Sequence, residues 1–281
     1  MTEQCNVQAA LDAAQKPFVE VINGTPFLLL PAGEGGWKAA EQPQLREAPL
    51  RKQGTTHLHQ TDSFISYVNL HKQVGTQIIV DANYAANSVK FKAVINGNSA
   101  AAAGFADHIA RFDPQTTIEW KNWTDMNGKK VTQMELATFL TNNISNIAST
   151  NPADPTRQYP NAADVLEFIT NLEMTSTVRY RSGTKVQNGQ VQFEYVEEGN
   201  DATKGKLQMF ERFGIGVVPY AGGQGYFIEA FLRFRINRDS GALTIWFDLH
   251  RPDQVLEAAT KAAIEQLQEE ITDCPIYFGT V

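Results

Sequence analysis

Three short segments of the sequence place two basic residues around one aromatic residue: Lys90-Phe91-Lys92, Arg179-Tyr180-Arg181 and Arg233-Phe234-Arg235. If each segment lies in a β-strand, the alternation of side chains puts both basic groups on one face and the aromatic ring on the other. Were the three strands neighbours in one sheet, six positive charges would line a surface that can bind phosphate groups. The anion-binding or nucleic-acid-binding residues that we predict are therefore Lys90, Lys92, Arg179, Arg181, Arg233 and Arg235.

The segment around Arg233 and Arg235 has the clearest strand pattern in the chain. Between Tyr226 and Asn237, apolar residues alternate with the two arginines, so both arginines project away from the apolar face. These basic groups could instead pair across strands with carboxylates, which is common on protein surfaces. The acidic candidates for such pairs are Glu119, Glu194, Glu229 and Asp248. Phosphate binding and structural ion pairing are thus two interpretations of the same pattern.

Residues with catalytic or metal-binding chemistry occur without a recognised spacing. His57, His59 and His71 could form a metal site with Asp62, but they lack the close Cys/His spacing of zinc sites. Asp107-His108 could be an acid–base pair, but it has no nucleophile in a fitting context. We therefore predict no catalytic residues, no metal site and no cofactor.

Two glycine clusters and two tryptophans have a structural interpretation. Gly33–Gly36 and Gly222–Gly225 lack the Gly-Lys-Ser/Thr ending of a phosphate-binding loop, which favours turns. Glu119, Trp120 and Trp123 could form a stacking platform for bases or sugars, but such aromatic residues more often lie in a core or an interface. We predict structural roles for both sets.

Composition and charge favour an ordinary folded protein. Of the 281 residues, 42% are hydrophobic and 20% charged, and a chain of this length buries a large core. The net charge of −7 disfavours general attraction to DNA or anionic lipid, and it is compatible with a local basic face. Because the N-terminus lacks a secretory signal and no window can span a membrane, we expect a soluble cytoplasmic protein with no membrane partner. Cys5 and Cys274 are then expected to be free thiols.

The first 62 residues are predicted to form a separate N-terminal part. It contains a short helix around Val7–Ala14, strands at Phe18–Ile22 and Pro26–Leu30, and a polar stretch from Pro31 to Asp62. A polar loop of this length is uncommon inside a compact domain, so it is either a mobile lid or an arm that packs on a neighbouring subunit, and we favour the arm. The protein is therefore predicted to be a homo-oligomer.

Residues 63–281 are predicted to form an α+β body. Its first part has strand patterns at Phe64–Val68, Thr76–Asp81 and Ser88–Ile95, followed by a short helix at Ala106–Phe112 and a strand at Thr116–Trp120.

Helix signals follow in the middle of the chain. Thr132 and Glu135 have the spacing of a capping box at the start of a helix. The segment 148–161 contains three prolines and indicates a linker or an internal hinge. Asn161 can then cap a second helix in which Val165 and Phe168 are buried.

The second half is rich in strand patterns and ends in an amphipathic helix. Asp253 can cap this helix, and Lys261 and Glu265 form an exposed pair on it. Mostly antiparallel sheets with a few packing helices give the α+β class. The strands are predicted at Thr175–Arg181, Gln190–Val196, Leu207–Val218, Tyr226–Asn237 and Ala242–Leu249.

Several pieces of the sequence occur together in an order that resembles a known family. They are Phe64–Asn69, Gly104–His108, Glu119-Trp120, Gln133–Leu140 and Arg251-Pro252. Over residues 60 to 280 the chain resembles the YfdQ-like family of uncharacterised phage and prophage proteins. The resemblance implies a bacteriophage or prophage origin in a bacterial host cell, near replication or recombination genes. It implies no reaction and no catalytic residues.

The sequence as a whole favours a non-enzymatic phage accessory protein that self-associates and binds a macromolecule, with DNA or RNA as the candidate partner. One alternative is a purely structural assembly or scaffold protein. Another is a metal-dependent nuclease or hydrolase that uses carboxylates such as Asp81, Asp107 and Glu119. Acidic residues in strands and loops are too common to form a signature of such an enzyme.

Overall fold

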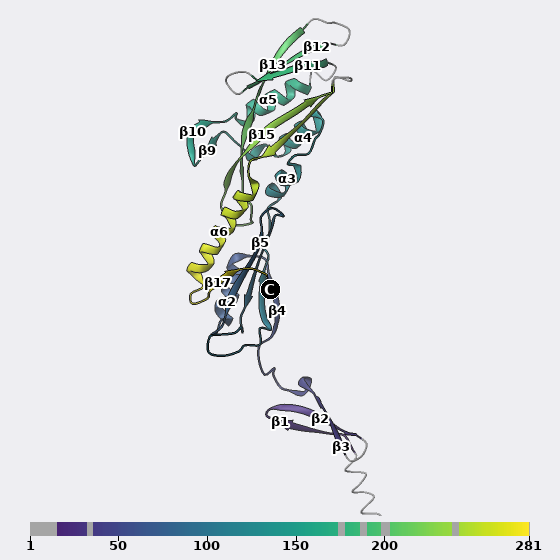
Figure 1. The fold of residues 1–281 in the computed structure, drawn as a ribbon, viewed down its shortest axis with the longest axis vertical. Helices are drawn as coiled ribbons and strands as arrows, with labels where there is room; N and C mark the ends of the chain where they lie inside the picture. The colour runs from purple at the N-terminus through teal and green to yellow at the C-terminus, as the bar shows by residue number, and fades with distance from the viewer. Residues whose placement is uncertain are drawn as a thin grey trace, which may run out of the picture. The chain divides into compact units, whose positions relative to one another are not determined.

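The computed structural model of the protein describes residues 16–32, 36–173, 178–185, 190–197, 203–237 and 242–280. The chain divides into two compact units, Met1–Gly54 and Thr55–Val281. As the sequence predicts, the fold is α+β, with mostly antiparallel sheets and a C-terminal helix (Figure 1). No helix in the described part of the chain is long and apolar enough to cross a membrane.

The first unit contains a three-stranded antiparallel sheet of order β1-β2-β3. Asn23 and Gly24 connect the first two strands with φ angles of 51° and 75°, as a two-residue hairpin turn requires. The strands are β1 (Phe18–Ile22), β2 (Thr25–Ala32) and β3 (Gly36–Glu41), and the first two confirm the predicted strands. The predicted helix at 7–14 lies outside the described residues.

The polar stretch from Pro31 to Asp62 is not the long loop that was predicted. It contains β3, a 3₁₀ helix at Pro43–Leu45 and the strand β4 (Gly54–Leu58). β3 pairs with β2 over its whole length, and such pairing can stabilise a strand whose own sequence is rich in glycine and polar residues. Because the segment is polar and rich in glycine, its sequence did not indicate the strand β3.

The second unit begins with a five-stranded sheet of order β17-β5-β6-β7-β4, covered on one face by helix α2 (Thr61–His71). Phe64, Ile65 and Val68 of α2 are buried, and the ring of Phe64 stacks on Phe112 at 5.5 Å. β17 is parallel to β5, whereas β5, β6 and β7 are antiparallel. The strands besides β4 are β5 (Gln77–Asn83), β6 (Ser88–Val94), β7 (His108–Phe112) and β17 (Ile276–Phe278).

Three predicted elements in this region were wrong. The segment Phe64–Val68 lies inside helix α2, because a short apolar run fits both periods and its apolar side chains pack on the sheet as one helical face. The segment Ala106–Phe112 contains the strand β7, in which buried residues alternate with more exposed ones. The segment Thr116–Trp120 enters helix α3 (Ile118–Met126), and Thr117 caps this helix by accepting from the backbone N–H of Trp120.

A four-stranded sheet of order β16-β15-β14-β8 forms the other half of the second unit. Helices α3 and α4 (Gln133–Asn142) supply aromatic rings to one of its faces: Trp123 lies 5.4 Å from Phe247 and 5.0 Å from Phe139. The side chains that alternate with this core point to the opposite face. The strands are β8 (Ile147–Ala148), β14 (Arg212–Val217), β15 (Tyr226–Ile236) and β16 (Leu243–Leu249).

Two smaller sheets complete the second unit. The predicted strand Leu207–Val218 is in fact two strands, β13 and β14, which separate at Glu211 and belong to different sheets. A hairpin of β9 (Thr150–Asn151) and β10 (Asp154–Gln158) occupies the proline-containing segment 148–161. The other sheet consists of β11 (Val178–Lys185), β12 (Gln190–Glu197) and β13 (Thr203–Phe210).

The helix caps agree with the sequence at two of three sites. Thr132 and Glu135 form the predicted capping box of α4. Asn161 accepts from the backbone N–H of Asp164 at 3.0 Å at the start of α5 (Ala162–Glu173). The C-terminal helix α6 (Pro252–Glu270) is not capped by Asp253, because its N-cap is Arg251 at a φ of 51°.

Candidate functional site

The three basic segments lie in three different sheets. Lys90 and Lys92 belong to β6 of the five-stranded sheet, and Arg233 and Arg235 belong to β15 of the four-stranded sheet. Arg179 and Arg181 belong to β11, and their side chains lie outside the described part of the structure. The six residues therefore do not line one sheet, and each pair has to be judged separately.

Lys90 and Lys92 lie on the face of their sheet that α2 leaves uncovered. Lys90 is opposite Asp81 on β5, and Lys92 is opposite Arg111 on β7. These groups, together with Asp113, line a groove of about 230 Å³. The lining contains two carboxylates and three basic groups, so the groove has mixed charge.

Arg233 lies on a face where arginines and aromatic rings are packed together. The guanidinium of Arg212 is 5.1 Å from the ring centre of Phe231, and that of Arg233 is 5.2 Å from the same ring. Arg233 is also directly opposite Trp246 on β16, and Lys130 lies 5.5 Å from the ring centre of Trp246. We call the outer surface of β14, β15 and β16, together with the side chains from outside these strands that contact it, the arginine face. It comprises Lys130, Arg157, Tyr159, Arg212, Glu229, Phe231, Arg233, Arg235, Trp246 and Asp248.

Glu229 holds part of the arginine face together. Its carboxylate pairs with Arg157 at 2.8 Å and with Arg212 at 3.2 Å, and it accepts a hydrogen bond from the hydroxyl of Tyr159. The side chain of Glu229 is 14% exposed, so these contacts are shielded from water more than an ordinary surface pair. Burial, and then the hydrogen bond to Glu229, raise the pKa of Tyr159 to about 12, so the phenol remains a donor at neutral pH.

The ion-pair interpretation holds for one predicted residue on this face. Arg233 pairs with Asp248 at 3.1 Å, although both side chains are about half exposed. Arg235 is exposed and lies opposite Thr244, which carries no charge. Five basic groups of the arginine face against its two carboxylates leave a surplus of three positive charges, in a chain whose net charge is −7.

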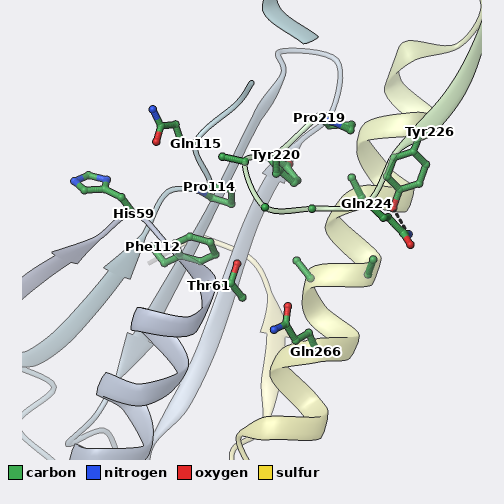
Figure 2. Close-up of a pocket in the computed structure, with 16 residues that line it drawn as sticks. His59, Thr61, Phe112, Pro114, Gln115, Pro219, Tyr220, Gln224, Tyr226 and Gln266 are labelled. Atoms are coloured by element: carbon green, nitrogen blue, oxygen red, sulfur yellow. Dashed lines mark hydrogen bonds between the residues drawn. The ribbon is translucent and has the colours of Figure 1, made fainter. Parts of the chain in front are cut away.

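A second site in this unit contains both a histidine and a glycine-rich segment that are distant from each other in the sequence. His59 and the glycine-rich segment Ala221–Gln224 line a pocket of about 230 Å³ between α2, α6 and the loop from β14 to β15 (Figure 2). Tyr220 anchors this loop, because its hydroxyl lies 3.2 Å from Thr260 of α6. The glycine cluster is thus a turn, as predicted, and it is also the wall of a cavity.

The remaining candidates are dispersed. His57 is exposed on β4, whereas His71 and His108 contact each other at a ring distance of 5.2 Å. Asp107 accepts from the side chain of Asn96, while the ring of His108 bonds the hydroxyl of Tyr67. Within the described residues, no three His, Cys, Asp or Glu side chains are grouped so as to hold a metal ion.

Trp120 and Trp123 do not form an exposed stacking platform, because both rings are buried. Their indole nitrogens donate to Asn87 at 2.9 Å and to Asn146 at 3.1 Å. The structural interpretation of these two residues is therefore correct. Phe231 and Trp246, on the outer face of the four-stranded sheet, are instead partly exposed.

Sequence reasoning missed Arg157, Arg212, Phe231 and Trp246 as site residues. Phe231 and Arg233 are two apart on one strand, and this aromatic–basic spacing is the local signal that could have found Phe231. Arg157 and Arg212 come from other strands, and only the pairing of β14 with β15 and the contact with Glu229 bring them to the face.

Comparison with known proteins gives the family and no activity. No curated protein and no solved structure matches the chain significantly. The family model that matches is described as "Uncharacterized conserved protein (DUF2303)", and it covers residues 1–281. Because this match spans the whole sequence, the chain belongs to the DUF2303 family of uncharacterized conserved proteins.

Proposed function

We propose that this protein binds single-stranded nucleic acid on the arginine face and acts without catalysis. The observation that supports the proposal is that the guanidinium groups of Arg212 and Arg233 both lie over the ring of Phe231, at 5.1 and 5.2 Å from its centre. Trp246 lies opposite Arg233 on the neighbouring strand β16. Basic groups that follow a backbone and aromatic rings on which bases stack are the two parts of single-strand recognition. A surplus of positive charge on this face supplies the electrostatic part.

The direction of these side chains favours a single strand over a duplex. Phe231 and Trp246 are partly exposed on a sheet surface, with Arg212 and Arg233 over the first ring and Lys130 over the second. Unpaired bases can stack on guanidinium planes as well as on the exposed parts of aromatic rings. In a duplex the bases are already stacked, so the rings would gain little. The stacked arginines can contact phosphates at the edge of the same surface.

The test is the salt dependence of binding to a labelled single-stranded oligonucleotide. Replacing Arg233 and Arg235 by alanine removes up to two phosphate contacts, and the slope of log affinity against log salt should flatten by about 1–2 units. The double variant Lys90→Ala and Lys92→Ala is the matched control, because it removes the same charge from another sheet. The control should retain the wild-type slope.

Either of two results would contradict the proposal. One is no affinity of the wild-type protein for DNA or RNA strands at low salt. The other is an equal loss of slope in both double variants, since that would indicate general charge attraction rather than a defined face.

The biological setting that we propose is a phage or prophage, with the protein acting in the cytoplasm of the bacterial host near replication or recombination. The support is the resemblance between residues 60–280 and the YfdQ-like proteins. Single strands are exposed in both processes, so the setting and the binding activity are compatible.

We also propose that the protein self-associates, with a second copy of the chain as the partner. In the described part of the first unit, the three-stranded sheet has exposed apolar side chains on β1 and β3, among them Phe18, Val19, Val21, Ile22 and Trp37. Small sheets of this kind are stable when a face is covered. A scaffold protein without nucleic-acid binding is the alternative that the ion pair of Arg233 with Asp248 favours.

A further inference from the structure

The pocket beside α6 is built from parts of the second unit that are well anchored. The loop from β14 to β15 is held by backbone hydrogen bonds from Thr117 to Pro219 at 3.0 Å and from Ala221 to Gln115 at 2.8 Å. Gly223 donates to Tyr220 at 2.9 Å and closes a turn. Gly222 has a φ of 78°, which favours glycine over a side chain at this point of the wall.

The lining of this pocket is polar and carries no permanent charge. None of the described residues that line it is Lys, Arg, Asp or Glu, and His59 is the one histidine among them. The nearest charge with a contact to the lining is Glu270, which accepts from the side-chain amide of Gln266 at 2.9 Å. Gln115, Gln224 and Gln266 supply side-chain amides, and Thr61 supplies a hydroxyl (Figure 2). An anionic ligand such as a phosphate would meet no Lys or Arg side chain in this lining, so the lining favours an uncharged ligand.

Aromatic and small side chains form the rest of the lining. Phe112 and Tyr226 contribute aromatic rings, and Ala259, Ala262 and Ala263 present short side chains from α6. Gln224 donates to the hydroxyl of Tyr226 at 2.6 Å, which fixes both side chains at the rim (Figure 2). A lining that combines aromatic rings with short alanine side chains leaves room for a planar group.

We propose that this pocket binds one nucleobase. A nucleobase is planar and uncharged, and its edge presents donors and acceptors side by side as a glutamine amide does. The base can come from a free nucleoside or from an unpaired position in a strand. The inference goes beyond the proposed function, because the pocket can bind a nucleoside even if the arginine face binds no strand.

The experiment measures binding of uridine, cytidine, adenosine and guanosine to the full chain by saturation-transfer NMR, with ribose as the ligand that lacks a base. At least one nucleoside should bind while ribose does not. Gln266→Ala should weaken this binding by about 2- to 10-fold, because one hydrogen-bonding amide is lost. Gln268→Ala is the matched control, since Gln268 is exposed on the same helix and does not line the pocket.

A comparison of the nucleoside with a short oligonucleotide of the same base identifies the source of the base. Tighter binding of the oligonucleotide that is weakened by Gln266→Ala indicates a base within a strand, and equal binding indicates a free nucleoside. The inference is overturned if no nucleoside binds at about 1 mM, if ribose binds as well, or if Gln268→Ala has the same effect as Gln266→Ala. Nucleoside binding that survives Arg233→Ala with Arg235→Ala separates this site from the arginine face.

Discussion

Glu229 is the residue on which the arginine face depends most. It is the carboxylate shared by Arg157 and Arg212, and it also accepts from the hydroxyl of Tyr159. A shared carboxylate fixes two arginines in place while neutralising the charge of only one. The carboxylate of Glu229 should therefore stabilise the folded protein and, at the same time, weaken the attraction of this face for nucleic acid.

We expect Glu229→Gln to destabilise the protein and to strengthen its binding to nucleic acid. The free energy of unfolding should fall by about 1–3 kcal/mol, because charge-assisted hydrogen bonds in a shielded site are lost. The salt slope of oligonucleotide binding should steepen, because one negative charge leaves the face. Urea unfolding and fluorescence anisotropy measure the two effects.

Asp248→Asn is the matched control for this prediction. It also converts a carboxylate of the arginine face to an amide, but the Asp248 side chain is 46% exposed, so its loss should cost about 0–1 kcal/mol. If both variants lose the same stability, the shielded network around Glu229 has no special role.

The phenol of Tyr159 gives the face a sensitivity to alkaline pH. Its pKa is raised to about 12 by burial and by Glu229, and the pKa of an ordinary tyrosine is about 10. A group whose pKa is higher in the folded state contributes stability that is fully present below pH 10 and is lost as the pH rises towards 12. Tyr159→Phe should therefore reduce the fall in unfolding free energy between about pH 8 and about pH 11.

The exposed Tyr277 provides the control, since Tyr277→Phe should leave the alkaline fall unchanged. Burial also raises the pKa of Tyr220 to about 12, so some alkaline sensitivity should remain in the Tyr159 variant. An identical pH profile for Tyr159→Phe and the wild-type protein would contradict the prediction.

At the scale of elements, Thr117 joins the loop from β14 to β15 to helix α3. Its hydroxyl accepts from the backbone of Trp120 at 3.1 Å and donates to the carbonyl of Val218. We expect Thr117→Ala to lower the free energy of unfolding by about 1–2 kcal/mol. Thr117→Ser keeps the hydroxyl and should recover most of this loss. Equal losses in the two variants would show that the methyl group, rather than the cap, is responsible.

Elements with a long or specific pattern could be predicted from the sequence. β15 alternates over eleven residues, and the capping box of α4 needs Thr132 and Glu135 at one spacing, so local information was sufficient for both. In α2 and β7 the decisive segments were short, and a short apolar run fits either period until tertiary packing selects one.

Only part of the candidate site could be predicted, because the site also depends on contacts between strands. The direction of Arg233 follows from the alternation of its own strand. Its partner Asp248 is one of the four acidic candidates of the sequence, but Arg157 and Arg212 reach the face through contacts with a residue of another strand, Glu229. The neighbourhood of a residue in a sheet depends on strand order, and no local pattern encodes that order.

At the scale of the whole molecule, the two units differ in how they are stabilised. The hydrophobic core of the described residues consists of side chains from the second unit. The sheet of the first unit has exposed apolar residues on both faces of β1. We therefore expect residues 55–281 to fold alone, and the first unit to require a partner.

This difference predicts different oligomeric states for the full-length chain and for a chain of residues 55–281 alone. In light scattering, the full chain should have a mass that is a multiple of 31.2 kDa, and residues 55–281 should be monomeric. Changing the exposed Val19 and Val21 to glutamate should also give a monomer of the full length, with a folded second unit. A full chain that is monomeric at micromolar concentration would contradict self-association.

Because the whole molecule is negatively charged, the binding of nucleic acid depends on where its positive charges are concentrated. A chain of net charge −7 repels nucleic acid in general, so an affinity for single strands has to originate in a local surface. We assign that surface to the arginine face.

Ultraviolet cross-linking of the full chain to a single-stranded oligonucleotide, followed by mass spectrometry of the peptides, tests this assignment most directly. The predicted result is that adducts form on the peptides containing Phe231 and Trp246, and that they decrease when Arg233 and Arg235 are replaced by alanine. Adducts confined to β6 or to the first unit, and unchanged in that double variant, would contradict it.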